Sequence, residues 1–542
     1  MHALTAPLSE LAEIEEICEE RGREPGMLLL SGCVTSQKTH LMYALGKGYG
    51  HTLIVLSSED KAKKLYEEYR FLNENTSYYP AKDLLFYQAD IHGKQLVKQR
   101  METLQMMMEA KSQVTVITTI DGFMDELPSE AEIKGDILTI SNGEALEFES
   151  LKEKIIKLGY DREAQVDGPG QFAVRGGIID IYPLTEELPI RIEFWGDEVD
   201  SIRTFDVDSQ RSVENLEQIV IYPADDRLGS DRKVSFINYF DPKDTLVFLD
   251  EPARLLEKGR LAENEVEKAR ENRAEEMERT GEMEEAPEFF TTDEIIKFLN
   301  KFCMIGMCAL EMKCKPFFVK KRFGIQAKSV NPYNSSFEML TQDLKRLKRN
   351  GYRAVLISGS RTRAKRLAED LRDYDLSSFY SEDQEREVNP GEIMVCYGHI
   401  EVGYEYPMIK FIVISESDIF GKTKKKKKRK SYDGQKISSF SDLKPGDYVV
   451  HENHGLGIYR GIEKIEVDKV TKDYMKISYA DGGNLYILAT QLDQIQKYAS
   501  ADAKKPKLNK LGGQEWHRTK SKVKTAVWQI AKDLVELYAV RQ

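Results

Sequence analysis

The stretch "MLLLSGCVTSQKTH", residues 27–40, joins an apolar run to a close variant of a phosphate-binding loop. That loop reads Gly, four residues, then Gly-Lys-Ser/Thr, and it lies between a strand and a helix. Gly32 begins the pattern, and Lys38 and Thr39 end it. Gln37, however, stands where the second glycine belongs. The stretch therefore predicts a strand–loop–helix unit whose loop has lost one of its two glycines.

Apolar runs that alternate with helical patterns surround this unit. The runs at 27–30, 52–56 and 114–118 are separated by the helical periods of residues 61–72 and 94–108. Strands that alternate with helices predict a parallel sheet. The opening part of the chain is therefore predicted to be an α/β domain.

The pattern changes further along the chain. Short strands bounded by glycines and polar turns at 120–208 predict a small α+β module. The α/β style returns with "VFLDEP" at 247–252, and residues 352–420 predict a second small α/β unit. Residues 441–499 alternate as short strands, with a tight turn at 481–483, and predict a small β barrel. The chain is therefore predicted to be a multidomain α/β protein.

These changes divide the chain into segments. They are the α/β domain, first part (1–119), the inserted module (120–208), the α/β domain, second part (209–335), an α/β spacer (336–420), a basic linker (421–440), the β barrel (441–500) and a C-terminal linker helix (501–542). That helix is amphipathic, and it packs either on this chain's own barrel or on a partner. Its apolar residues recur at steps of three and four: Val523, Val527, Ile530, Leu534 and Leu537.

Charge is distributed unevenly along the chain. A net charge of -12 argues against a protein that coats nucleic acid over its whole surface. Residues 422–430 nevertheless hold eight basic side chains, and residues 275–288 are strongly acidic. Each run is either a solvated linker or helix face, or, for the lysine run, a weak contact to double-stranded DNA. No apolar run approaches a membrane span and no signal peptide begins the chain, so we expect a cytoplasmic protein without a membrane partner.

Two groups of residues could suggest a metal site. Cys303, Cys308 and Cys314 lie close together in an apolar stretch, where buried free thiols are the favoured interpretation. His451 and His454 have no further ligand residues at metal spacing. We therefore expect no metal.

Four longer stretches carry a family resemblance. They are "GQFAVRGGIIDIYP" (170–183), "FWGDEVDSIRTFDVDSQRS" (194–212), "LKPGDYVVHENHGLGIYRGI" (443–462) and "KLGGQEWHRTKSKVK" (510–524). In this order the chain resembles the bacterial transcription-repair coupling factor (Mfd) family. The resemblance implies a degenerate RecA-like domain similar to UvrB, a spacer, and a Tudor/SH3-like barrel of the CarD type. Family members continue into a double-stranded-DNA translocase motor that uses ATP and Mg²⁺, so we expect this chain, which stops at Gln542, to be a fragment.

The resemblance assigns the inserted module to the surface that binds the excision-repair protein UvrA. The matching motifs place that contact at Arg175 of "FAVRG", at Arg191, Glu193 and Phe194 of "RIEF", and at Arg162 of "GYDRE". Arginine and aromatic residues on a small rigid sheet are typical interface anchors. The alternative is that they are ordinary surface arginines and a core phenylalanine, since Phe194 alternates with apolar neighbours.

The same resemblance implies that the β barrel binds the β subunit of RNA polymerase. An exposed strand edge that pairs with a partner strand is a plausible mode. The apolar position of the contact falls on Ile465, with Lys464 and Glu466 beside it. The chain departs from the family pattern at Leu488, where a proline is usual, which puts the local strand geometry in doubt.

The opening loop is interpreted as the remains of a nucleotide site. If the position of Gln37 needs positive φ, a residue with a Cβ costs about 1–2 kcal/mol there, and its side chain enters the phosphate space. Asp250 and Glu251 resemble the acidic Mg²⁺-binding strand of such enzymes. No Gln-x-x-Gly-Arg-x-x-Arg segment follows to reach a γ-phosphate. We expect no cofactor and no hydrolysis from this chain, with weak nucleotide binding as the open alternative.

These observations favour a non-catalytic adaptor between stalled RNA polymerase and UvrA. The rival hypothesis is an ATP-driven DNA translocase or helicase, which is the activity of full-length family members. A UvrB-like damage-probing role is disfavoured, because residues 78–93 lead directly to a helix without an aromatic-rich hairpin.

Overall fold

The computed structural model shows mixed α/β architecture in two units, which are treated separately below. One unit spans residues 1–85 and 98–424, and the other spans 86–97 and 425–542. Within the described residues, no helix is long and apolar enough to cross a membrane. The structure describes residues 2–22, 24–82, 94–207, 209–225, 233–280, 289–311, 313–383, 385–421, 435–436, 443–451, 454–467, 470–480, 482–488, 495–498, 506–510 and 516.

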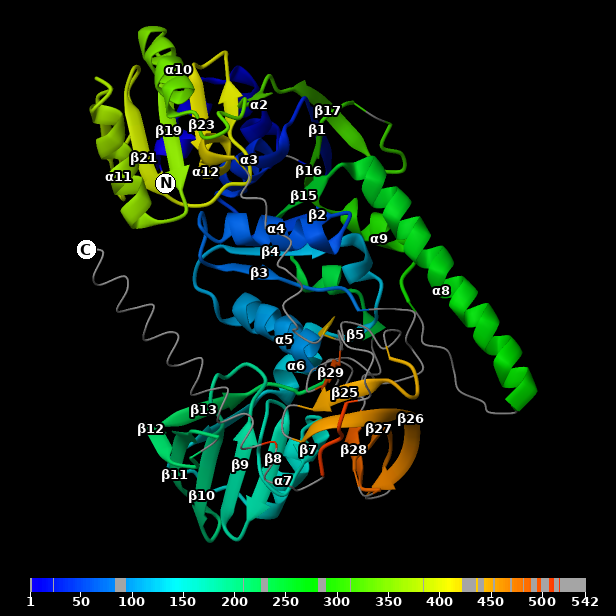
Figure 1. Cartoon of the computed structure of the whole chain (residues 1–542). Helices are drawn as coiled ribbons and strands as arrows, with labels where there is room; N and C mark the ends of the chain where they lie inside the picture. The colour runs from blue at the N-terminus through cyan, green and yellow to red at the C-terminus, as the bar shows by residue number, and fades with distance from the viewer. Residues whose placement is uncertain are drawn as a thin grey trace. The chain divides into compact units, whose positions relative to one another are not determined.

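A parallel sheet of seven described strands forms the largest layer of the first unit (Figure 1). Its order is β17-β1-β16-β15-β2-β4-β3, and every neighbouring pair is parallel. The central strands are buried throughout, as expected for a sheet covered on both faces. The parallel sheet predicted from the alternation of strands and helices is confirmed. The strands are β1 (Gly26–Ser31), β2 (His51–Leu56), β3 (Thr76–Tyr78), β4 (Val114–Thr119), β15 (Thr245–Asp250), β16 (Cys303–Cys308) and β17 (Val319–Gly324).

Helices connect these strands and begin at recognisable signals. Acidic residues occupy the first turn of α4, where their negative charge interacts favourably with the positive end of the helix dipole. Thr291 and Glu294 form a capping box at the start of α9. Figure 1 shows the long helix α8 extending beyond the sheet. The main helices are α1 (His2–Thr5), η1 (Ala6–Glu10), α2 (Ala12–Glu20), α3 (Thr35–Gly46), α4 (Glu59–Tyr69), α5 (Lys94–Glu109), η2 (Ile120–Phe123), η3 (Phe236–Tyr239), α8 (Pro252–Thr280) and α9 (Thr292–Leu299).

The inserted module contains a second sheet, with six described strands in the order β12-β11-β10-β9-β8-β7. One face of this sheet packs on α7 (Phe148–Lys157) through isoleucines and leucines, and the other face is polar. Two short ladders, β5 (Leu127–Pro128) with β14 (Lys233–Val234) and β6 (Leu138–Ser141) with β13 (Gln218–Ile221), flank it in sequence together with α6 (Glu130–Asp136). The six strands are β7 (Asp161–Arg162), β8 (Gln171–Arg175), β9 (Ile178–Tyr182), β10 (Ile190–Trp195), β11 (Glu198–Phe205) and β12 (Ser212–Leu216).

A second α/β lobe follows in the same unit. Its sheet has the order β18-β22-β23-β19-β21-β20 over the described residues, with parallel pairing around β19. Apolar residues of this lobe and of the first α/β lobe join in one core cluster, which includes Leu41, Tyr406 and Phe411. The elements are β18 (Lys328–Ser329), α10 (Phe337–Arg349), β19 (Arg353–Ser358), α11 (Arg361–Arg372), β20 (Ser378–Tyr380), β21 (Ile393–Tyr397), β22 (Tyr404–Tyr406), β23 (Phe411–Ser415) and α12 (Glu416–Phe420).

The second unit contains an antiparallel sheet of six described strands in the order β24-β29-β25-β26-β27-β28. Val449, Met475 and Ile477 contribute to its core. The predicted lysine run at 422–430 and the predicted helix residues Val523 to Leu537 lie outside the described residues. The strands are β24 (Gln435–Lys436), β25 (Tyr448–His451), β26 (Gly455–Val467), β27 (Val470–Ser478), β28 (Asn484–Leu488) and β29 (Ile495–Lys497).

Candidate functional site

Helix α3 occupies most of the predicted phosphate loop. The helix begins at Thr35, three residues before Lys38, and the Lys38 amide donates to the Val34 carbonyl at 3.1 Å. The buried side chain of Gln37 accepts a hydrogen bond from the Val34 amide at 3.0 Å. A phosphate loop needs amides that turn inward around an anion, and here the Lys38 amide is used within the helix. The predicted loop is therefore shorter than expected, because Gln37 caps an additional turn of helix.

Lys38 is held between two carboxylates. Its Nζ lies 2.6 Å from Asp250 Oδ1 and 2.7 Å from Glu251 Oε1. Lys61 lies 3.5 Å from the other Asp250 oxygen, and Glu251 also accepts the Ala309 amide at 3.0 Å. Burial lowers the pKa of Lys38, but the two carboxylates more than offset this effect, so the pKa lies above its usual value. The structure thus brings together the predicted residues Lys38, Asp250 and Glu251 in one ionic cluster.

Thr39, the predicted magnesium ligand, is bonded within the protein. Its hydroxyl donates to Glu68 Oε2 at 2.7 Å, and the Ser36 hydroxyl donates to Glu68 Oε1 at 2.6 Å. The second α/β lobe adds the Glu401 amide to Glu68 at 2.7 Å and the Val402 amide to Ser36 at 3.2 Å. The first turn of α3 is therefore covered by the second lobe.

His40, on the same helix, is buried where the two lobes meet. Its Nε2 donates to the Leu4 carbonyl at 2.6 Å, so its Nδ1 accepts from the Tyr406 hydroxyl at 3.0 Å. The ring stacks on Tyr404, with 5.2 Å between the ring centres. Burial lowers the pKa of His40 to about 4, which keeps the ring neutral.

Gly32 is retained for a geometric reason. Its φ is +80°, and a Cβ at this position would lie 2.4 Å from the Ile325 carbonyl oxygen. Any other residue would be strained and would collide with backbone. This glycine therefore serves the packing of β1 against the chain after β17.

The polar face of the inserted module carries a second ionic cluster, centred on Asp180. Arg191 donates from Nε to Asp180 Oδ1 at 2.6 Å and from Nη2 to Oδ2 at 2.9 Å. Arg175 donates to Oδ2 at 2.5 Å. The Asp180 side chain is 1% exposed, whereas those of Arg191 and Arg175 are 15% and 46% exposed. Hydrogen bonding to Asp180 raises the pKa of Arg191, and the Arg191 guanidinium lies 4.5 Å from the centre of the Phe205 ring.

The other predicted residues of the module divide between its two faces. Glu193 forms an ion pair with Arg203 on the polar face and accepts a hydrogen bond from Ser201 at 3.1 Å. Phe194 packs against the core cluster and contacts Phe148 edge-on, with 5.2 Å between the ring centres. Arg162 is exposed on β7, at the edge of the sheet. The structure therefore brings Arg175, Arg191 and Glu193 to one face and turns Phe194 toward the interior.

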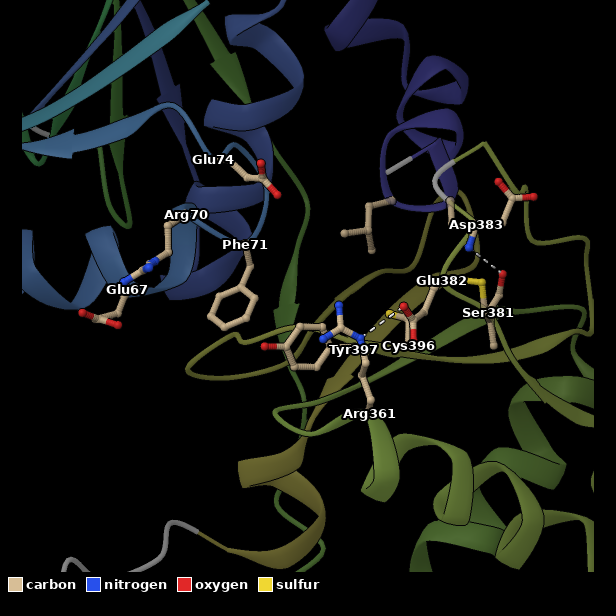
Figure 2. Close-up of a pocket in the computed structure, with 13 residues that line it drawn as sticks. Glu67, Arg70, Phe71, Glu74, Arg361, Ser381, Glu382, Asp383, Cys396 and Tyr397 are labelled. Atoms are coloured by element: carbon tan, nitrogen blue, oxygen red, sulfur yellow. Dashed lines mark hydrogen bonds and ion pairs between the residues drawn. The ribbon is translucent and has the colours of Figure 1, made fainter. Parts of the chain in front are cut away.

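A separate cavity of about 530 Å³ lies at the carboxyl ends of β20 and β21 (Figure 2). Figure 2 shows Arg361 over the Tyr397 ring and bonded to Glu382, with Phe71 beside Tyr397. The Arg361 guanidinium is 4.5 Å from the ring centre, and Phe71 meets Tyr397 at 5.5 Å. None of the residues predicted for nucleotide, UvrA or polymerase binding lines this cavity.

Comparisons with known proteins agree on one family. The "UvrB interaction domain" family matches residues 138–226, and the "CarD-like/TRCF RID domain" family matches residues 443–499. The transcription-repair-coupling factor of Bacillus subtilis (strain 168) is 30% identical over 95% of this chain and 48% of its own length. That of Staphylococcus haemolyticus is 29% identical over 95% of this chain and 49% of its own length.

The chain belongs to the transcription-repair-coupling factor family. The resemblance predicted from the four sequence stretches is thereby confirmed. The chain spans about half the length of the curated relatives that it matches. The predicted UvrA-binding residues all fall inside the matched UvrB interaction domain, and Lys464, Ile465 and Glu466 fall inside the matched CarD-like domain.

The predicted polymerase contact of this family member lies on a projecting pair of strands. Lys464, Ile465 and Glu466 belong to β26, where Ile465 pairs with Lys472 of β27. Among the described residues, β25 pairs with β26 only as far as Ile458, and β28 pairs with β27 only from Tyr474. The backbone around Ile465 therefore has an open edge in the described part of the sheet. The side chains of residues 464–466 lie outside the described part of the structure.

Leu488, where the resemblance leads us to expect a proline, ends β28 and pairs with Tyr474, so this position is part of a strand.

Two residues of the module were not predicted from the sequence. Asp180 interrupts the apolar strand "IIDIY", and a lone carboxylate in such a strand is a signal that could have identified it. Trp195 is 82% exposed at the end of β10, on the side of the strand opposite to Phe194. The alternation of apolar residues along β10 is the signal that could have identified its exposure.

The cysteines and histidines that were considered as metal ligands belong to the packing of the two units. Cys303, Cys308 and Cys314 are buried free thiols, as predicted, and burial raises the pKa of each. His451 is buried beside His454 in the β sheet of the second unit. The described residues contain no group of three His, Cys, Asp or Glu side chains that could hold a metal ion.

Proposed function

We propose that this chain is a non-catalytic adaptor that joins stalled RNA polymerase to UvrA in transcription-coupled repair. One observation carries the proposal: the matched UvrB interaction domain and the matched CarD-like domain occur on one chain, in which helix α3 occupies most of the degenerate phosphate loop. Two interaction domains on one chain increase the local concentration of one partner near the other.

The UvrA contact is proposed on the polar face of the inserted module. Arg175 is half-exposed beside Arg191, and the two guanidinium groups outnumber the one carboxylate that they share. A carboxylate of the partner would complete this arrangement, because arginine binds carboxylates through paired N–H donors. Glu193 on the polar face and Arg162 at the edge of the same sheet are included in the proposed contact.

The contact to the β subunit of RNA polymerase is proposed on the projecting β26–β27 pair. Its open edge at Ile465 fits recognition by strand addition, in which backbone hydrogen bonds supply affinity and side chains supply specificity. We assign the sheet of residues 441–500 to a Tudor/SH3-like barrel of the CarD type. The lysine run is proposed to give double-stranded DNA at most a weak, salt-sensitive contact.

A bridging experiment tests the adaptor. Immobilised polymerase β subunit is incubated with the chain and then with UvrA, without ATP or DNA. We expect UvrA to be retained only when the chain is present, and to be lost with Ile465→Arg or with Arg175→Glu. The proposal would be refuted if the β subunit retained UvrA without the chain, or if it failed to retain UvrA when the chain was present.

The rival function is the ATP-driven DNA translocation that the family resemblance implies for the whole protein. The ion pairs of Lys38 and the hydrogen bond from Thr39 to Glu68 support the adaptor over this rival for the present chain. Steady ATP hydrolysis that is lost in Lys38→Ala would favour the enzyme instead.

A further inference from the structure

Asp180 is a buried carboxylate that accepts hydrogen bonds from two arginines. Three N–H groups, two from Arg191 and one from Arg175, reach its oxygens at 2.5–2.9 Å. Its side chain is 1% exposed, although its neighbours Ile179 and Ile181 along β9 are core residues of the opposite face. A buried charge is costly unless it is paired and hydrogen-bonded, so Asp180 depends on both arginines.

The strand register explains how one carboxylate reaches both arginines. Asp180 lies opposite Arg191 of β10 on one side and opposite Ala173 of β8 on the other. The small Ala173 leaves room above it, and Arg175, two residues further along β8, reaches Asp180 diagonally. Each guanidinium is therefore held by its bonds to Asp180, although the arginine side chain that carries it is flexible.

The cluster retains unbalanced positive charge at the surface. Two guanidinium groups share one carboxylate, and the Arg175 side chain, which gives Asp180 a single N–H, is 46% exposed. A guanidinium that is already held in place loses less side-chain freedom when it binds a partner's carboxylate. Well-packed apolar residues often stabilise a fold as much as a buried ionic group does, or more. Stability alone therefore does not account for this arrangement.

We propose that Asp180 is the positioning residue of the UvrA-binding surface, which orients Arg175 and Arg191 together so that they receive one carboxylate of the partner. The inference rests on the proposed UvrA contact and deepens it. Asp180 itself does not touch the partner in this arrangement, because the two arginines cover it.

The test compares UvrA binding by the full chain and its variants at a temperature below the thermal midpoint of every variant. Asp180→Asn keeps the side-chain shape and removes the charge, and we expect affinity to fall about tenfold or more. Arg175→Ala should cost about tenfold in the wild-type background and less than threefold in Asp180→Asn, because the arginine is no longer held. A purely structural role would instead give costs that add in full.

Two further variants keep the outcome interpretable. Asp125→Asn breaks another buried arginine–aspartate pair, with Arg100 at 2.7 Å, and should lower stability while leaving UvrA binding unchanged. Asp180→Glu keeps the charge but displaces it by one methylene, and should also lose about tenfold in affinity. If wild type binds UvrA and both Asp180 variants bind within twofold of it, this inference alone is overturned. If wild type does not bind, the proposed function falls and takes the inference with it.

Discussion

The ionic cluster around Lys38 (the α3 cluster) and the ionic cluster around Asp180 (the module cluster) have similar arrangements with opposite charges. In the α3 cluster, one mostly buried cation, Lys38, lies between the carboxylates of Asp250 and Glu251, and the more exposed Lys61 reaches Asp250 at 3.5 Å. In the module cluster, one buried anion, Asp180, lies between two arginines. The outer groups of the first are 10% and 14% exposed, whereas Arg175 of the second is 46% exposed. The same pairing of buried charge therefore holds the fold together in one region and presents a binding group in the other.

The largest expected effect is the loss of Lys38 from the α3 cluster. Lys38→Met would leave two carboxylates close together in a poorly solvated place, at a cost of about 3 kcal/mol in the free energy of unfolding. Denaturant unfolding of the full chain measures this cost. UvrA affinity should be unchanged, because the cluster lies outside the module. An unchanged midpoint would show that the cluster is solvated and that the comparison is wrong.

Charge reversal in the module should act more strongly on binding than on folding, because Arg191 still gives Asp180 two of its three hydrogen bonds from arginine. Arg175→Glu should weaken UvrA binding about a hundredfold, since a repulsive carboxylate replaces a half-exposed donor. Titration calorimetry measures the affinity, and circular dichroism checks the fold. Arg191 is unsuitable for the same reversal, because it supplies two of the three bonds that neutralise Asp180. Equal binding by Arg175→Glu and wild type would remove this face from the interface.

The pH dependence of stability should report the buried interface around His40. Its pKa is lowered to about 4, so the unfolded chain binds a proton below about pH 6.5 while the folded chain does not. This contribution to stability is present near neutral pH and is lost as the pH falls toward 4. Between pH 7 and pH 5 we expect a loss of about 2 kcal/mol in the free energy of unfolding. His40→Gln, measured at both pH values, should lack this part of the loss; an identical pH dependence would contradict it.

The sequence predicts the order of strands and helices along the chain better than it predicts the two ionic clusters. The apolar runs around residues 28, 54 and 116 correspond to β1, β2 and β4, because a fully buried parallel strand has few polar positions. The loop at Gln37 differs from its prediction because a local side chain and a distant lobe both stabilise helix there. The lone carboxylate in "IIDIY" marks Asp180, but its arginine partners cannot be predicted, because they are set by strand register, which a single sequence does not specify.

The smallest expected effect concerns Gln37, which replaces the second glycine of the phosphate-loop pattern. Gln37→Gly completes the pattern in the sequence. In the structure, the surrounding bonds also oppose a nucleotide: Lys38 is ion-paired, and Ser36 and Thr39 are bonded to Glu68.

We therefore expect Gln37→Gly to lower the free energy of unfolding by about 1 kcal/mol, through lost helix propensity and the lost cap, and to leave ATP binding undetectable by calorimetry with Mg²⁺ present. Gln37→Ala is the matched control, because it removes the cap without adding backbone freedom, and it should be more stable than the glycine variant. ATP binding by Gln37→Gly that disappears in the double variant with Lys38→Ala would show that one glycine suffices. The α3 cluster would then be a dormant site and no longer the closed counterpart of the module.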